Sequence, residues 1–276
     1  MIRTEIVKLL VRPRTWITVL LLCLLPFVVA IFLATTNLAP PPGEGPAFLS
    51  AVLRDGTLYP AAALAMVVPV FLPVSVAVLA GDSVAGEATG GTLRYLLVRP
   101  VGRTRLLVAK LVSVLVFVLL AIAAVIVTSY LTGRALLGGG QPAAVALPGG
   151  TTSLSGTPLT PTDLFLRTLA SIGYATVCML AVAAIALFLS TLTDSALGAA
   201  LGALAVLVAS ELLATLDAAS SVQPYLPTRY WLAWIDFFRQ PIFWRDIDRG
   251  LAVSGVYIGL LLLASWANFM TRDITA

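Results

Sequence analysis

Residues 106–133, LLVAKLVSVLVFVLLAIAAVIVTSYLTG, are almost wholly apolar and contain one charge, Lys110, near their start. As an α-helix rising about 1.5 Å per residue, such a stretch is long enough to cross the roughly 30 Å hydrocarbon layer of a bilayer. Its apolar residues do not alternate with polar ones, as the strands of a membrane barrel would. The stretch therefore predicts a transmembrane helix.

The rest of the chain repeats this pattern. Of its 276 residues, 59% are hydrophobic and 11% are charged, against roughly 25% charged in a soluble domain. Hydropathy predicts six spans, at 16–36, 58–80, 106–133, 164–190, 195–216 and 250–269. We therefore expect an all-α membrane protein whose residues 1–276 form a single transmembrane domain. The first span is too long for the apolar core of a signal peptide and lacks a cleavage site, so we expect it to be retained.

The distribution of cations predicts the orientation of the chain. Six spans put both termini on the same side, and ten of the seventeen Lys and Arg residues fall in short segments on that side. These ten are Arg3, Lys8, Arg12, Arg14, Arg94, Arg99, Arg103, Arg105, Lys110 and Arg272. By the positive-inside rule both termini are cytoplasmic. Abundant Ala, Leu, Val and Arg are typical of a GC-rich bacterial genome, so the expected location is a bacterial inner membrane.

Two segments outside the spans have a composition of their own. Residues 1–15 place apolar and basic residues on different faces and predict a helix lying at the inner interface; a basic tail is the alternative. Residues 217–249 gather aromatic side chains and predict short helices in the outer leaflet. They form either a lid over an exit path or an aromatic anchor.

Residues inside the spans suggest packing and transport roles. Small residues stand four apart at Gly198 and Gly202 in the fifth span and at Gly255 and Gly259 in the sixth. Such pairs let helix backbones approach closely, in a dimer seam or within one bundle. Pro69 and Pro73 should kink the second span. Glu211 lies within the fifth span and either contributes to a translocation path, together with the kinked span, or belongs to the outer interface.

Several classes of protein are excluded by what the sequence lacks. There is no histidine, which removes the usual triads and zinc sites, and no GxSxG or Walker A pattern occurs. We therefore expect no catalytic, cofactor or metal site in this chain. Cys23 and Cys178 lie inside spans, so we interpret them as small apolar side chains and not as a disulfide or a metal-binding pair. No basic stripe with interleaved aromatics suggests nucleic acid.

The densest polar stretch links the second and third spans: GDSVAGEATGGTLRYLLVRPVGRTRLLVAK, residues 81–110. Asp82 can cap a short segment through Glu87, and the next helical segment carries an apolar ridge of Leu93, Leu96 and Leu97 at i, i+3 and i+4. Such a ridge framed by charge suits docking into a groove of a soluble partner. The alternative is that these cations only fix the topology.

This stretch resembles the segment between the second and third helices of type-2 ABC exporter permeases. The matching residues are Glu87, Gly91, Thr92, Leu93, Pro100, Arg103 and Lys110. The six spans, the N-terminal helix and the short helices before the last span are also similar to that family. The resemblance covers essentially the whole chain, but it is motif-like only in this segment.

The resemblance implies the permease subunit of an ABC transporter, working in export as a homodimer or heterodimer. Each half would dock on a separate ATPase subunit that binds ATP and Mg. Coupling would fall to residues 81–105 and to the turn around Asp194, with these candidate residues: Asp82, Glu87, Gly91, Thr92, Leu93, Arg94, Leu96, Leu97, Pro100, Arg103 and Asp194. Two alternatives stay open: a stand-alone channel or secondary carrier not driven by ATP, and a membrane scaffold or sensor.

Overall fold

The computed structural model describes residues 1–35, 56–89, 103–137, 151–152 and 158–271, and this part of the chain is almost entirely helical. The long elements, in chain order, are α1 (Ile2–Val11), α2 (Pro13–Thr35), α4 (Tyr59–Val67), α5 (Phe71–Thr89), α7 (Arg103–Thr132), α8 (Pro161–Leu192), α9 (Ala196–Thr215) and α10 (Trp244–Thr271). The short helices are η1 (Gly56–Leu58), the π-helical η2 (Gly133–Leu137), η3 (Asp217–Ala219), η4 (Gln223–Tyr225) and η5 (Ala233–Phe238). β1 (Thr151–Thr152) pairs antiparallel with β2 (Pro158–Leu159).

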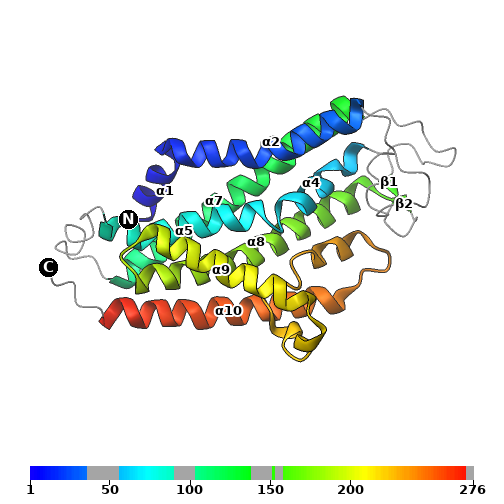
Figure 1. Ribbon diagram of the computed structural model, residues 1–276. Coiled ribbons are helices and arrows are strands. Elements are labelled where there is room, and N and C mark those ends of the chain that lie inside the picture. Colours follow the sequence, from blue (N-terminus) through cyan, green and yellow to red (C-terminus); the bar gives the residue numbers. More distant parts are fainter. Residues whose placement is uncertain (36–55, 90–102, 138–150, 153–157, 272–276) are drawn as a thin grey trace.

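The long helices run back and forth between two ends of the bundle, and the start of α1 and the end of α10 lie at the same end (Figure 1). We call this the terminal end and the other the far end. Among the described residues, five helices are long and apolar enough to cross a membrane, or six if a bent pair counts as one span. The molecule is therefore a multi-pass membrane protein by helix length and composition, in agreement with the six predicted spans.

The bent pair consists of α4 and α5, which meet at an angle of 53°. Pro69 and Pro73 cannot donate backbone hydrogen bonds to the carbonyls of Ala65 and Pro69, so the helical ladder is interrupted here. The ladder resumes when Val74 donates to the carbonyl of Val70. This confirms the predicted kink in the second span.

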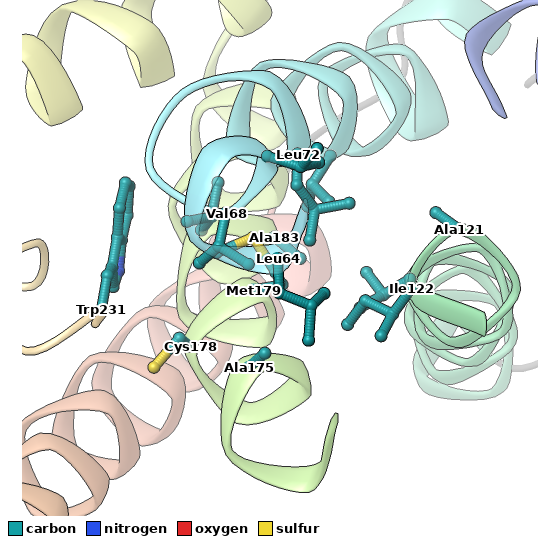
Figure 2. Close-up of a cluster of buried hydrophobic side chains, with 14 of the residues drawn as sticks. Leu64, Val68, Leu72, Ala121, Ile122, Ala175, Cys178, Met179, Ala183 and Trp231 are labelled. Atoms are coloured by element: carbon teal, nitrogen blue, oxygen red, sulfur yellow. The ribbon is translucent and has the colours of Figure 1, made fainter. Parts of the chain in front are cut away.

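Helix α8 lies at the centre of the bundle, where it packs against α5, α7, α9 and α10. It is the most buried candidate span, and many of its residues are small: Ala175, Ala181, Ala183, Ala184 and Ala186 are all buried. Small residues let helix backbones approach closely, which matters in lipid because burying apolar surface there contributes little. In the core, side chains of α4, α5 and α7 and Trp231 surround α8 (Figure 2).

The helix ends differ from the predicted spans most at α5 and α10. Helix α5 continues through Asp82 and Glu87 to Thr89, so residues 81–89 extend the second span instead of forming a separate segment. Helix α10 starts at Trp244, before the predicted position 250. Both extensions carry charged residues, which lower the hydropathy of a window without breaking a helix.

The aromatic segment before α10 is built of short 3-10 turns folded onto the bundle. Its aromatic residues divide into two groups: Tyr230, Trp231, Trp234, Phe237 and Phe238 are buried, whereas Tyr225, Phe243 and Trp244 are exposed. Arg167 of α8 fixes the turn by donating from Nη1 to the carbonyls of Phe237 (2.9 Å) and Arg239 (3.0 Å). The short helices match the prediction for this segment, while five of its eight aromatic side chains are buried.

Candidate functional site

A cluster of charged side chains joins α1, α5 and α7 at the terminal end. We call it the charge cluster; its members are Glu5, Lys8, Arg12, Asp82, Glu87 and Lys110. On α1, Glu5 and Lys8 are spaced i and i+3 and so lie on one face of the helix, and Arg12 follows as the C-cap residue of α1. The cluster lines a hollow of about 780 Å³ between α1 and the bundle.

Lys110 is the most buried member of the cluster. Its side chain is 3% exposed, and Nζ lies 2.9 Å from Oε2 of Glu87. Nζ also donates to the backbone carbonyl of Ser83, one turn before Glu87 on α5. A buried ammonium is tolerated only with such partners, because desolvation costs several kcal/mol per ion. The pair therefore fixes the start of α7 against the end of α5.

Lys8 of α1 shares the same carboxylate. Its Nζ lies 3.5 Å from Oε1 of Glu87 and 3.1 Å from Oε1 of Glu5. Partial burial alone would lower the pKa of Lys8, but the hydrogen bonds and charges of Glu5 and Glu87 outweigh it and raise the pKa above 10.5. At the rim, Arg12 Nη1 lies 3.5 Å from Oδ2 of Asp82. One carboxylate on α5 thus holds cations from two other helices.

Local hydrogen bonds set the angle between α1 and α2. Arg12 is extended, as expected for a residue before proline, so α1 ends and the chain turns at Pro13. Thr15 Oγ1 donates to the carbonyl of Leu9 and Trp16 Nε1 to the carbonyl of Leu10, each at 2.7 Å. These bonds satisfy carbonyls at the end of α1, and they hold its charged face toward α5.

The end of α5 is also fixed from its other side. Ser190 Oγ of α8 donates to the carbonyl of Gly81 (2.7 Å) and accepts from the N–H of Ala85 (2.9 Å), so it bridges two groups one turn apart. A Cβ at Gly81 would lie 2.9 Å from the backbone nitrogen of Ala200 in α9, a contact that only glycine permits. The turn that carries the charge cluster is therefore clamped between α8 and α9.

This arrangement links α1, α5 and α7 at the terminal end through ion pairs. The charged groups satisfy one another across three helices, and no cluster of three or more His, Cys, Asp or Glu side chains within the described ranges could hold a metal ion. Helix α5 runs without a break from the charge cluster to the bend beside Pro69. A displacement at one end of α5 would therefore reach the far end.

Only some of the predicted coupling residues lie in the part of the chain that the structure describes. Asp82 and Glu87 belong to the charge cluster, and Asp194 is exposed in the short connection between α8 and α9. Arg103 is the first residue of α7. The others lie outside the described residues: Gly91, Thr92, Leu93, Arg94, Leu96, Leu97 and Pro100.

The remaining predicted site residues lie elsewhere in the bundle. Pro69 and Glu211 line one hollow at the far end; Pro73 is not among its lining residues. A Cβ at Gly202 would touch the Leu189 side chain, so this glycine packs within the chain. A Cβ at Gly198 would meet Ser195, the N-cap residue of α9, and Thr193, the C-cap residue of α8. Gly255 and Gly259 have nothing within 4 Å in the described structure, so their packing role stays a prediction for a contact with another molecule.

The comparisons with known proteins place this bundle in a family. A family model described as a protein of unknown function, DUF2705, matches residues 27–275. The chain belongs to the DUF2705 family. The match covers Glu87 and Lys110 but begins inside α2, so α1 of this DUF2705 protein lies before it. No curated protein matches the chain.

Four members of the charge cluster of this DUF2705 protein were not predicted as site residues. Lys8 and Arg12 were placed only among the cytoplasmic cations, Lys110 only among these cations and the residues that carry the family resemblance, and Glu5 had no predicted role. One signal was present: Lys110 lies inside the apolar stretch 106–133, and a cation within a span requires a buried acidic partner. Glu87 was the nearest acid before it in the chain.

Proposed function

We propose that this DUF2705 protein is the membrane-spanning permease subunit of an ABC transporter, acting in export and driven by a separate ATPase subunit. The observation that carries the proposal is the charge cluster at Glu87. This residue belongs to the motif that resembles type-2 ABC exporter permeases, and its carboxylate is held by cations from α1 and α7.

The mechanism follows from the position of residues 90–102. They join the end of α5 to the start of α7, and Lys110–Glu87 ties these two helices together one to two turns away. If the ATPase binds this connection and closes on ATP and Mg, it pulls on α5 and α7 as one unit. Because Lys8 shares Glu87, α1 follows. Helix α5 then carries the displacement to the bend at Pro69.

The proposal fixes an orientation and an assembly. The terminal end, with α1 at the inner interface, faces the cytoplasm of a bacterium, and the short helices η3–η5 lie at the outer leaflet. Two permease chains, identical or related, form the translocation path between them. ATP and Mg are bound by the partner subunit and not by this chain.

Co-purification tests the proposal directly. The tagged chain, expressed in its own host and extracted in a mild detergent, is expected to retain a subunit with Walker motifs and ATPase activity. A control chain with residues 90–102 replaced by a Gly/Ser linker is expected to insert but not to retain that subunit. Recovery of the permease with no ATPase, or equal recovery with the linker control, would contradict the proposal. Solute flux through reconstituted protein without nucleotide would instead favour a channel or carrier.

A further inference from the structure

A hollow of about 740 Å³ lies at the far end, between the α4–α5 bend, the end of α9, the 3-10 segment and the start of α10. We call it the far-end hollow. It shares no residue with the charge cluster, yet six charged side chains line it, three of each sign: Glu211, Asp236, Asp246, Arg229, Arg239 and Arg249. A mixed lining without net charge favours a ligand that itself carries both charges.

The charges of the far-end hollow are only partly neutralised by one another. Arg239 Nε pairs with Asp236 Oδ1 at 2.9 Å. Asp246 and Arg249, three residues apart on α10, both face the hollow but form no ion pair or hydrogen bond with any described residue. Glu211 likewise has no such partner in the described part of the chain. The carboxylates of Glu211 on α9 and Asp246 on α10 and the guanidinium of Arg249 are therefore open to a ligand.

The carboxylate of Asp236 also favours binding of a cation in the far-end hollow. Burial raises the pKa of Asp236; Arg239 opposes this effect, and the negative charge of Asp246 adds to it. The two acids thus interact unfavourably across the hollow. An ammonium group bound beside Asp246 would relieve this repulsion.

The apolar part of the lining supplies a route to lipid. Trp231 lines the hollow and is 3% exposed. At the rim, Val70 and Leu232 are 55% and 41% exposed, which gives apolar chains a surface to follow into the membrane.

We propose that the far-end hollow binds the headgroup of a zwitterionic phospholipid with a primary ammonium group. The ammonium is held by Asp246 and Glu211 and the phosphate by Arg249 and Arg229, while the acyl chains leave past Val70 and Leu232. A hollow of this volume is in the range that holds a small ligand. The proposal goes beyond the permease function, because this binding requires neither an ATPase nor transport.

The test compares lipids on the full chain purified in maltoside detergent, by native mass spectrometry. Dihexanoyl-phosphatidylethanolamine is expected to bind about tenfold more tightly than dihexanoyl-phosphatidylglycerol, which has the phosphate but no ammonium; this is the change expected when a charge-assisted hydrogen bond is lost. Free phosphoethanolamine is expected to bind at least about tenfold more weakly than the lipid, because it lacks the chains. Equal binding of the two lipids would overturn the ammonium site, and equal binding of the free headgroup would overturn the lipid.

Neighbouring residues on α10 provide matched controls. Asp246→Asn and Arg249→Gln are expected to weaken phosphatidylethanolamine binding about tenfold each. Asp248→Asn and Arg245→Gln, which are exposed and do not line the hollow, should leave it unchanged. Equal losses in the controls, or none in the two lining variants at an unchanged elution volume, would refute the site.

Discussion

The packing of helices at the terminal end depends on Glu87, because this residue forms ion pairs with the buried Lys110 and the half-exposed Lys8. Removing one partner of a buried pair costs more than the pair itself contributes, since the other charge is left in a poor solvent. Glu5, in contrast, contacts only Lys8 in the cluster, whose side chain is 40% exposed. The two acids should therefore respond very differently to neutralisation.

Glu87→Gln is expected to destabilise the protein by about 3 kcal/mol, the usual loss when a buried pair is broken, whereas Glu5→Gln should cost less than about 1 kcal/mol. The measurement is thermal unfolding in detergent. Adding Lys110→Met to Glu87→Gln should restore part of the loss, because no buried cation remains. Similar melting temperatures for the two single variants would contradict this account of the cluster.

Asp236 gives a dependence on pH with a definite sign. Its folded pKa lies above the ordinary 3.8, so the folded state binds a proton more readily than the unfolded state. The charged form therefore costs stability at neutral pH, and this cost disappears as pH falls through the folded pKa toward 3.8. Asp236→Asn is expected to be more stable than the wild type at pH 7 and equal to it near pH 4, as measured by melting temperature. A difference that grows on acidification would contradict the sign.

The sequence identified Asp82 and Glu87 as important but not what they contact. Hydropathy treats Lys110 as one unfavourable residue in a favourable window, and it gives no sign that α1 folds back to the same place. The angle between α1 and α2 depends on two side-chain bonds from Thr15 and Trp16. No periodicity in the sequence encodes these bonds.

At the scale of elements, α5 is the helix that connects the two ends of the molecule. Its terminal turn is held by Ser190 on one side and approached by the α9 backbone at Gly81 on the other. Its first turn follows the bend at Pro69. A change in how closely α5 packs should therefore be felt along the whole helix.

Gly81→Ala is expected to destabilise the bundle, because the new Cβ would lie 2.9 Å from a backbone nitrogen that cannot move alone. Gly255→Ala is the control, since its Cβ would meet nothing within 4 Å among the described residues. This control should be neutral or gain up to about 1 kcal/mol from helix propensity. The measurement is the melting temperature of each variant. Equal changes at both positions would show that the close approach of α9 to α5 does not determine stability.

The predicted ridge at Leu93, Leu96 and Leu97 gives a second test at this scale. Leu93→Asp is expected to abolish stimulation of the partner ATPase while the chain still inserts, because losing an apolar anchor at an interface costs about 2 kcal/mol or more. Tyr95→Asp, off the ridge by helical spacing, is the control and should retain most of the activity. ATP hydrolysis by the purified complex is the measurement. Full activity of Leu93→Asp would remove the docking role.

Most elements were predictable because a membrane span needs only length and low polarity. Five predicted spans match single helices and the other matches the bent α4–α5 pair, and α9 agrees with its predicted range within a residue at each end. The extension of α5 to Thr89 was not predictable from hydropathy, because Asp82 and Glu87 are helical residues whose charges are satisfied by other helices. The burial of Trp231 and Trp234 was missed for a similar reason: their composition suits an interface as well as a core.

At the scale of the whole molecule, the proposal requires the two ends to face opposite sides of the membrane. Asp194 is exposed at the terminal end and Ser221 at the far end. The central position of α8 could not be predicted from the sequence, because all six spans are apolar and hydropathy does not show which of them faces lipid. The predicted topology, however, depends only on the number of spans and the cations.

Labelling of single cysteines tests this topology. In a background with Cys23→Ala and Cys178→Ala, a membrane-impermeant maleimide added to intact cells is expected to label Ser221→Cys and not Asp194→Cys. After the cells are opened, both should react. Labelling of Asp194→Cys in intact cells would reverse the orientation and place residues 90–102 out of reach of a cytoplasmic ATPase.

The burial of Trp231 and Trp234 also makes the molecule its own optical reporter. The other three tryptophans, Trp16, Trp244 and Trp266, are between 43% and 55% exposed and should be quenched by brominated acyl chains or by iodide. The emission that survives quenching then comes from the two buried indoles of the 3-10 segment. Its wavelength and lifetime would follow events at this one place without any dye being attached.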